Sequence, residues 1–380
     1  MRTFYEFFAG GGMARAGLGA DWNCLFANDF DFKKGASYEV NWGGEHLFIG
    51  DVAKIEAAAL PGQADLAWAS FPCQDLSLAG TGAGLNGSRS GTFWPFWQLV
   101  KNLSGEGRAP RMVLLENVCG ALTSHGGRDF CAIVAALVSE NYKVGCLVVD
   151  AVNFVPQSRP RLFFVAMQAD APIPYRLVSL VPEAPWHSAG LIDAYKRLSQ
   201  VSRDAWVWWR LPKPLLRKQA FADLIEDQPA GMQWHTHDET LRILSTMTPL
   251  HLAKVDAARQ SGKRMVGAIY RRTRPDGNGG RVVRAEVRFD DVAGCLRTPG
   301  GGSSRQIIML VDGNRIRTRL LSPREAARLM GLPDTYQLPQ NYNDAYHLVG
   351  DGLVVPVVRY LAANILEPLI LHGAAMKMAA

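Results

Sequence analysis

Phe4-Tyr5-Glu6-Phe7-Phe8-Ala9-Gly10-Gly11-Gly12-Met13-Ala14-Arg15-Ala16-Gly17-Leu18 is the stretch that decides the fold of this chain. Phe4–Phe8 has the aromatic character of a short buried strand, three glycines follow it, and Met13–Leu18 is compatible with a helix. A strand, a glycine turn and a helix open a nucleotide-binding βαβ unit, because glycines let the backbone approach a ligand and a helix N-terminus offers free N–H groups. A plain tight turn explains the glycines about equally well, so the choice between these two interpretations depends on motifs in the rest of the chain.

Strand and helix patterns alternate from this stretch to residue 166. We expect further strands at 22–27, 46–49, 65–69, 111–115, 144–149 and 162–166. We expect helices at 31–41, from residue 93 onward and at 130–140. This alternation predicts the α/β class, with a doubly wound, mostly parallel, Rossmann-like sheet. The alternation stops after Pro174, which predicts a second domain that is smaller and irregular.

Acidic residues stand where the next two predicted strands end. Asp29 follows the glycines by about 20 residues, a spacing that suits an acceptor for a ribose diol. Phe30 offers a ring that can stack on an adenine, whereas a cap for the following helix is the alternative role of the acid. Asp51, followed by Val52, ends the third strand in the same way. Three successive strand ends with a glycine turn or an acid indicate a nucleotide-like cofactor at this edge of the sheet.

Cys73 follows the fourth predicted strand, within Phe71-Pro72-Cys73-Gln74. A thiol at the end of a parallel strand is a common place for a nucleophile, although a lone cysteine is more often a buried small hydrophobe. Residues 78–92 include five glycines. This composition is typical of a mobile lid, and a disordered connector is the alternative.

Glu116 ends the fifth predicted strand, beside apolar neighbours that are expected to raise its pKa and make it a proton donor. An exposed glutamate at a strand end is the alternative. Arg159 and Arg161 alternate in an extended segment, so we expect their guanidinium groups on one face. Such a pair suits a phosphate or a polarised ring carbonyl, and an ion pair at the edge of a strand is the alternative.

The positive charge of the chain is concentrated in one segment. Residues 1–170 carry 13 Lys and Arg against 16 Asp and Glu, whereas residues 259–328 carry 16 against 6. A basic segment beside a slightly acidic body predicts a polyanionic partner, most often a nucleic acid, although a solvated basic surface is the alternative. Six scattered cysteines without a CxxC pair indicate a reducing cytoplasm and no structural zinc. The sequence predicts no signal peptide, no membrane span and no dimer-forming helix, and so a cytoplasmic monomer.

Taken in order, the motifs resemble those of the DNA cytosine-5 methyltransferases. The resemblance rests on Phe8-Ala9-Gly10-Gly11-Gly12, Asn28-Asp29, Gly50-Asp51, Phe71-Pro72-Cys73-Gln74, Glu116-Asn117-Val118, Gln157-Ser158-Arg159-Pro160-Arg161 and the segment 321–334. These motifs extend over nearly the whole chain, and only residues 175–290 lack a recognisable one. The resemblance implies methyl transfer from S-adenosylmethionine to carbon 5 of a cytosine turned out of duplex DNA, through a covalent cysteine adduct.

The resemblance also implies a role for each motif. Cys73 is the nucleophile toward carbon 6, Glu116 holds and protonates ring nitrogen 3, and Arg159, with Arg161, contacts the base carbonyl and a phosphate. Asn117 and Gln157 orient these groups. The implied S-adenosylmethionine site consists of Phe8, Ala9, Gly10, Gly11, Gly12, Asp29, Phe30, Asp51, Val52, Pro72 and Asp351. The residues expected to contact DNA are Ser77, Arg89, Arg297, Ser303, Ser304 and Arg305.

The second half of the chain is where this family places target recognition. We expect a catalytic domain of residues 1–178 and 345–380 and a recognition domain of residues 179–344. Within the latter, 271–280 is typical of a basic loop or hairpin, and 281–288 alternates, so we expect its arginines to line one face of a strand. Two positions depart from the family pattern, because Cys295 replaces a threonine and Asp351 replaces an asparagine. Asp351 has two expected roles, a partner for the cofactor ammonium group or a cap for the following helix.

Two other functions remain open at the level of sequence. One is the same chemistry on RNA, and the other is a catalytically inactive DNA-binding homologue. Intact Cys73, Glu116 and Arg159 weigh against the second. The target sequence cannot be read from these residues.

Overall fold

The computed structural model describes every residue except 73–84, 86–89, 277–278, 298–304 and 380. The chain forms two compact units. Unit 1 comprises Met1–Asp150, Pro160–Pro214 and Val355–Ala380, and unit 2 comprises Ala151–Arg159 and Leu215–Val354. Residues 179–214, expected in the recognition domain, pack in unit 1, because Val144 pairs with Ala205 and the Trp209 indole donates to the Val165 carbonyl at 3.1 Å. Their assignment to target recognition stays a prediction.

A seven-stranded sheet in the order β3-β2-β1-β4-β5-β7-β6 forms the centre of unit 1. Its strands are β1 (Arg2–Phe7), β2 (Trp22–Asp29), β3 (Leu47–Ile49), β4 (Leu66–Ala69), β5 (Met112–Val118), β6 (Tyr142–Asp150) and β7 (Pro160–Gln168). The first five are parallel to one another, whereas β7 lies between β5 and β6 and is antiparallel to both. The strand order reverses beside β1 and β4, which is where α/β sheets bind ligands. The predicted doubly wound, mostly parallel fold is confirmed.

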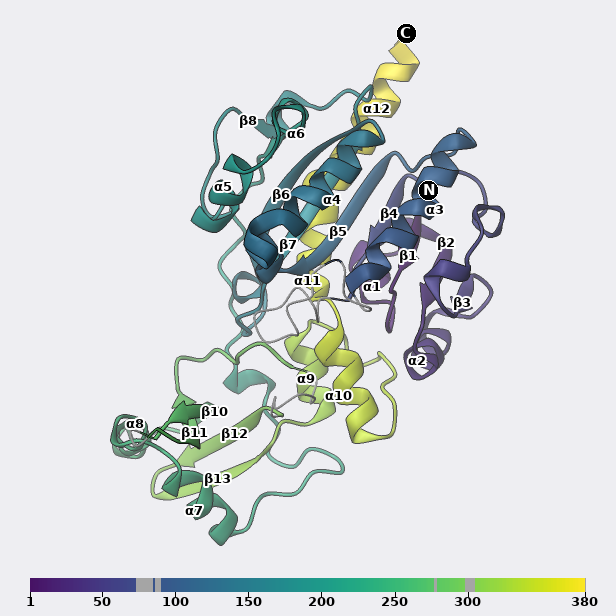
Figure 1. Ribbon diagram of the computed structural model, residues 1–380. Helices are drawn as coiled ribbons and strands as arrows, with labels where there is room; N and C mark the ends of the chain where they lie inside the picture. The colour runs from purple at the N-terminus through teal and green to yellow at the C-terminus, as the bar shows by residue number, and fades with distance from the viewer. Residues whose placement is uncertain (73–84, 86–89, 277–278, 298–304, 380) are drawn as a thin grey trace. The chain divides into compact units, whose positions relative to one another are not determined.

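Helices cover both faces of this sheet (Figure 1). The helices of unit 1 that follow are α1 (Met13–Leu18), α2 (Phe32–Trp42), α3 (Phe93–Gly105), α4 (Arg128–Ser139), α11 (Val355–Leu361) and α12 (Glu367–Ala379). In Figure 1, α3 and α4 lie in front of the sheet and the yellow helices α11 and α12 lie behind it. Helix α1 packs on α11 so closely that a Cβ at Gly17 would lie 2.3 Å from Cβ of Val358.

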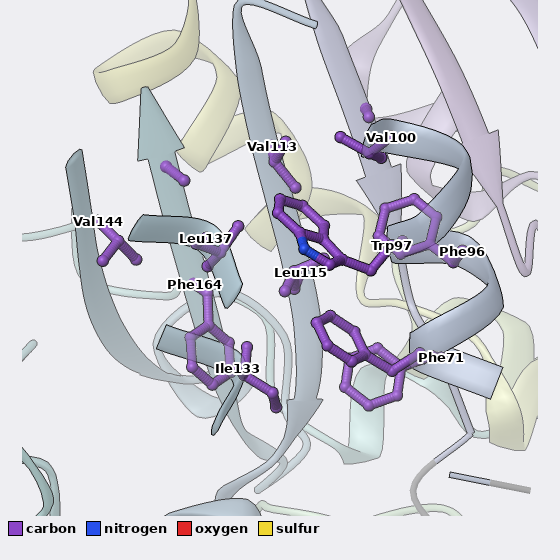
Figure 2. Close-up of a cluster of buried hydrophobic side chains, with 14 of the residues drawn as sticks. Phe71, Phe96, Trp97, Val100, Val113, Leu115, Ile133, Leu137, Val144 and Phe164 are labelled. Atoms are coloured by element: carbon purple, nitrogen blue, oxygen red, sulfur yellow. The ribbon is translucent and has the colours of Figure 1, made fainter. Parts of the chain in front are cut away.

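The hydrophobic core on the α3 and α4 face holds the end of β4 in place. Figure 2 shows Phe71, Phe96 and Trp97 gathered against Val113 and Leu115 of β5. Phe71 follows β4, is 2% exposed and packs on Phe93 with ring centroids 5.4 Å apart. This packing fixes the backbone two residues before Cys73.

Shorter elements complete unit 1. They are α5 (Ala189–Lys196), α6 (Gln200–Asp204), the two-stranded pair β8 (Val178–Ser179) and β9 (Trp208–Trp209), and the 3₁₀ turns Val52–Lys54, Ala57–Ala59, Ser90–Thr92, Cys119–Leu122, Ser124–Gly127 and Tyr175–Leu177. Trp208 and Trp209 are 9% and 0% exposed, so these two tryptophans belong to the core.

Unit 2 contains a four-stranded antiparallel sheet in the order β11-β10-β12-β13. The strands are β10 (Met265–Pro275), β11 (Arg281–Arg288), β12 (Ile307–Asp312) and β13 (Arg315–Leu320), and the helices are α7 (His237–Ser245), α8 (Pro249–Gln260), α9 (Pro323–Leu329) and α10 (Tyr342–Asp351), with 3₁₀ turns at Ala151–Asn153 and Ala222–Leu224. This unit is more regular than predicted. The pattern was hidden because 266–269 is buried on both faces of β10 and shows no alternation.

The predicted basic hairpin is confirmed, but the expected single face of arginines in β11 is wrong. Side chains alternate with a period of two, so Arg281 points to the opposite face from Arg284 and Arg288. The register places Arg284 directly opposite Arg272 of β10. Arg272, Arg274, Arg284 and Arg288 therefore form one surface, which we call the arginine face.

The C-terminal stretch Tyr342–Gly373 is long and apolar enough, by length and composition alone, to cross a membrane. Half of its apolar window is buried inside the protein, and residues 352–354 interrupt the helix between α10 and α11. Five residues in a π-helix, Ala362–Leu366, then connect α11 to α12. The side chains of Val358, Leu361 and Ile365 are fully buried, as expected for a core helix that covers a sheet.

Candidate active site and cofactor edge

The glycine turn between β1 and α1 is held by main-chain hydrogen bonds. The N–H of Ala9 donates to the Asn28 carbonyl at 2.9 Å, and the N–H of Gly12 donates to the Ala9 carbonyl at 2.8 Å. Gly10 and Gly12 have φ of 56° and 76°, which explains why glycine is needed there. Phe8 has φ of 56° without being glycine, a conformation that costs about 1–3 kcal/mol and persists only where the surroundings impose it.

Asp29 at the end of β2 holds the turn from the side. Its two carboxylate oxygens accept the N–H of Gly10 at 2.7 Å and the N–H of Asp31 at 2.8 Å. Burial raises the pKa of Asp29, and the N–H of Asp31 opposes that shift. The helix cap is Asp31, which accepts the N–H groups of Lys33 and Lys34, so Asp29 is not the cap. Each carboxylate oxygen of Asp29 retains acceptor capacity for a ribose hydroxyl.

The other residues predicted for the cofactor lie at the ends of β2 and β3. Phe30 is 76% exposed just after the end of β2, so its ring is accessible. Asp51 accepts the N–H of Ala53 at 3.0 Å and caps a 3₁₀ turn that buries Val52. Asn28 ties the two strand ends together, because its side-chain amide donates to the carbonyls of Phe48 and Gly50.

Glu6 is a candidate site residue that the sequence did not lead us to predict. It lies within β1, is 1% exposed, and its Oε2 atom has no hydrogen-bond partner among the described residues. Burial raises the pKa of Glu6 to about 8, against the opposing effect of the N–H and the positive charge of Arg15. An acid in an otherwise aromatic strand beside a glycine turn was the available signal, because such a group is rarely buried without a partner.

Glu116 and Arg161 form an ion pair in unit 1, with 3.1 Å between Oε1 of Glu116 and Nε of Arg161. Strand β5 continues through Glu116 to Val118, so Glu116 lies inside the strand rather than after it. Val118 pairs with Arg161 in the antiparallel register of β5 and β7, which brings the two charged side chains together. An antiparallel β7 was not predicted, and it is the reason that residues 45 apart meet.

Asn117 connects β5 to the segment that leads into Cys73. It is 2% exposed and donates from its side-chain amide to the Phe71 carbonyl at 3.2 Å. Its Oδ1 accepts the N–H of Val118 at 2.9 Å. The predicted orienting role of Asn117 thus has a contact that can carry it.

Arg159 and Gln157 lie in unit 2 and contact backbone there. The Arg159 guanidinium donates to the carbonyls of Leu296 at 3.1 Å, Gly350 at 2.9 Å and Gly352 at 2.8 Å. Gln157 donates to the Leu329 carbonyl and accepts the N–H of Leu296. The expectation that Arg159 and Arg161 share one face does not match these contacts, because Arg159 precedes β7 and its side chain binds a different unit from that of Arg161.

Several predicted residues lie outside the described residues, namely Cys73, Ser77, Arg89, Ser303 and Ser304. Arg297 is exposed, and Arg305 lies 5.5 Å from the centroid of the Tyr342 ring and contacts Asn343. Asp351 is exposed at the last position of α10 in unit 2. Their predicted contacts with DNA and cofactor stay predictions.

The chain matches the model of the C-5 cytosine-specific DNA methylases over residues 2–367. It belongs to this family. As a member, this methylase is a DNA cytosine-5 methyltransferase, and the glycine turn, Glu116 and Arg161 described above lie within the matched residues.

Curated relatives of the methylase are type II methyltransferases. M.HpaII of Haemophilus parainfluenzae is 26% identical over 97% of this chain and 90% of its own length. M.NlaX of Neisseria lactamica is 26% identical over 95% of both chains, and M.HhaI of Haemophilus parahaemolyticus is 25% identical over 95% of this chain and 93% of its own.

Solved structures support the fold of the methylase. The Dnmt2 methyltransferase of S. pombe aligns with a TM-score of 0.63 at 16% identity, covering 97% of this chain and 99% of that one. The DNMT2 mutant of Spodoptera frugiperda aligns with a TM-score of 0.60, also at 16% identity, covering 97% and 100%. Among the described residues of the methylase, no group of three or more His, Cys, Asp or Glu side chains is placed to hold a metal ion.

Proposed function

We propose that this methylase transfers the methyl group of S-adenosylmethionine to carbon 5 of a flipped cytosine in duplex DNA, with Cys73 as nucleophile. The observation that carries the proposal is the Glu116–Arg161 pair on β5 and β7, joined through Asn117 to Phe71. An acid and a guanidinium thus stand on β5 and β7, and β5 is the neighbour of β4, the strand after which the Cys73 segment begins. This is the set of groups that cytosine activation requires.

The described residues fit S-adenosylmethionine. The cofactor carries positive charge on its sulfonium and ammonium groups, and the unpartnered Oε2 of buried Glu6 lies in the strand that leads into the glycine turn. Asp29 would accept the ribose hydroxyls and exposed Phe30 would stack on the adenine. Asp51 and Val52 complete the edge formed by β1, β2 and β3. When bound, S-adenosylmethionine supplies an electrophilic methyl group.

The protein residues make carbon 5 of cytosine a nucleophile. The Cys73 thiolate forms a bond to carbon 6, and the electrons of the C5–C6 double bond become available at carbon 5, which takes the methyl group. Loss of the carbon 5 proton to solvent then expels the thiolate and restores the ring. Glu116 holds and protonates ring nitrogen 3 during the addition, so that charge does not accumulate on the base, and it takes this proton back when the thiolate leaves.

The guanidinium beside the base is, in this proposal, Arg161 rather than Arg159. Arg161 already contacts Glu116, so an entering cytosine can take its carbonyl oxygen to Arg161 and its ring nitrogen to Glu116. Arg159 is 3% exposed and donates to three main-chain carbonyls of unit 2. We assign Arg159 the role of fixing the backbone of unit 2, where the phosphate contacts of Arg297 and Ser303 are predicted.

The arginine face of unit 2 fits the phosphates of duplex DNA. Arg272 and Arg274 are exposed and share the single carboxylate of Glu286, which leaves excess positive charge on this surface. Phosphate contacts position a protein on DNA and supply most of the salt dependence of binding. We propose that this surface positions the duplex while a cytosine is flipped, a step that costs a few kcal/mol.

The test uses a duplex that contains 5-fluorocytosine, from which the fluorine cannot leave as a proton does. The complete methylase with S-adenosylmethionine is expected to give a covalent protein–DNA adduct on a denaturing gel, and Cys73→Ala is expected to give none while still binding DNA. Binding without an adduct by the unaltered chain supports the inactive homologue instead. Methyl transfer to RNA with none to duplex DNA supports the RNA methyltransferase.

A further inference from the structure

Trp42, the last residue of α2, also contacts the glycine turn and holds it in place. The indole Nε1 of Trp42 donates to the Gly11 carbonyl at 2.9 Å. The N–H at the other end of the same peptide unit, on Gly12, donates to the Ala9 carbonyl at 2.8 Å. The peptide unit between Gly11 and Gly12 is therefore fixed at both ends, and it cannot rotate without breaking two hydrogen bonds.

The indole also packs directly against Gly12. A Cβ at Gly12 would lie 2.4 Å from Nε1 of Trp42, closer than real side chains approach, and 3.0 Å from Cε2 of Tyr38, which is tighter than most real contacts. Tyr38 is fully buried one turn earlier on α2. Gly12, the residue just before α1, therefore has no room for a side chain beside these two rings. The turn and α2 pack together as one structure.

Trp42 is itself held by α1. The guanidinium of Arg15 lies 5.2 Å from the centroid of the Trp42 ring and 5.9 Å from that of Tyr38, and it donates to the Tyr38 hydroxyl at 3.2 Å. The same hydroxyl lies 3.1 Å from Nε2 of His46. Contacts therefore run from the glycine turn through α1 to α2 and back to the turn, and they close on Trp42.

The turn needs these contacts because Phe8, at the start of the turn, adopts a costly left-handed conformation. Strain of this kind persists only where several contacts impose it. We propose that Trp42 is a positioning residue for the cofactor, and that it holds the Gly11–Gly12 peptide unit in the conformation that S-adenosylmethionine binds. The proposal rests on the proposed function and adds a residue that touches neither the cofactor nor the base.

The test compares two tryptophans that each lose one indole hydrogen bond when changed to phenylalanine. Trp42→Phe keeps a ring against Gly12 and removes the donor to Gly11. Trp22→Phe, the control, removes the bond from the indole to Glu367 at 3.1 Å, at the start of β2 rather than at its cofactor end. Calorimetry with S-adenosylmethionine and with S-adenosylhomocysteine gives both dissociation constants for the complete chain.

Trp42→Phe is expected to raise both dissociation constants by about fivefold, the effect of one neutral hydrogen bond, and to leave kcat at saturating cofactor within about twofold. Trp22→Phe is expected to leave cofactor binding unchanged. Unchanged binding by folded Trp42→Phe, or an equal loss in both variants, overturns the proposal. Failure of the unaltered chain to bind S-adenosylmethionine overturns the proposed function instead.

Should Trp42→Phe fail to fold, Arg15→Met carries the test. It removes the cation stacked on the Trp42 ring and keeps an apolar stem. Weaker cofactor binding by folded Arg15→Met supports the proposal, and unchanged binding overturns it.

Discussion

The strand ends of unit 1 and the hairpin of unit 2 use charge in opposite ways. In unit 1 the charged groups are matched locally, since Asp29 accepts two main-chain N–H groups and Glu116 pairs with Arg161. In unit 2 Arg272 stands directly opposite Arg284, and like charges in such cross-strand pairs destabilise a sheet. The difference teaches that unit 1 is arranged to hold precise geometry, whereas unit 2 keeps a surplus of charge that a polyanion can neutralise.

The largest expected effect tests the matched charge of unit 1. Glu116→Gln keeps the shape of the side chain but removes the acid, so the rate of methyl transfer is expected to fall by about 10²–10⁴-fold. DNA affinity, measured by fluorescence anisotropy, is expected to stay within about threefold. A fully active Glu116→Gln variant contradicts the assigned role.

The next prediction separates the two arginines on either side of the boundary between units. Arg161→Met is expected to lower kcat by about a hundredfold, because a developing charge on the base loses its donor. Arg159→Met leaves three carbonyls of unit 2 without their donor and is expected to lower the free energy of unfolding by roughly 3 kcal/mol. Single-turnover kinetics and urea unfolding measure the two effects. The reverse pattern restores Arg159 as the residue beside the base.

A third prediction concerns Glu6, the charge in unit 1 that has no matched partner at Oε2. Its pKa is raised to about 8 in the folded protein, so the stabilisation is complete below the unfolded pKa and is lost as pH rises through 8. The free energy of unfolding should therefore decrease above pH 5, by up to about 1.4 kcal/mol per pH unit. Affinity for the cationic cofactor should increase over the same range, by about tenfold between pH 6.5 and 8.5.

Glu6→Gln is the control for that prediction, because glutamine has no proton to lose in this range. Urea unfolding and calorimetry across the pH range are expected to lose both trends. Trends that persist in Glu6→Gln assign them to other titratable groups, such as Asp29, whose charge acts on Glu6.

The smallest expected effect tests the surplus charge of unit 2. Arg284→Gln is expected to lower the slope of log affinity against log salt concentration by about 1, because one phosphate contact is lost. The same change relieves the repulsion from Arg272 and is expected to stabilise the protein by a few tenths of a kcal/mol. Lys196→Gln, an exposed lysine on α5 of unit 1, is the control. An unchanged slope of log affinity against log salt concentration means that the arginine face does not contact DNA.

The sequence predicted what is determined locally. The strand, glycine turn and helix at 4–18 were found because each residue's preference agrees with its neighbours'. The hairpin at 271–288 was found from its turn residues and alternation, although its first strand begins earlier, at Met265. The insertion of β7 between β5 and β6 was not predicted, since pairing partners distant in sequence leave no local pattern.

The sequence predicted which types of residue form the site better than how their side chains are arranged. A spacing of two residues suggested that Arg159 and Arg161 act together, but this rule holds only inside a regular strand, and Arg159 precedes β7. Glu6 and Trp42 were not predicted as site residues because their proposed roles depend on their surroundings in the folded protein. Neither the unpartnered oxygen of Glu6 nor the indole contact with Gly11 can be read from residue types.

The close contact of Gly17 with Val358 has a consequence for how the protein is made. Helices α11 and α12 cover part of one face of a sheet whose strands end at residue 168, so that part stays uncovered while the ribosome adds almost two hundred further residues. Apolar strands left uncovered during synthesis are prone to aggregate. A chain that stops short of α11 therefore lacks part of the cover of its own sheet. Helices synthesised long after the last strand thus complete the domain that the first strands begin.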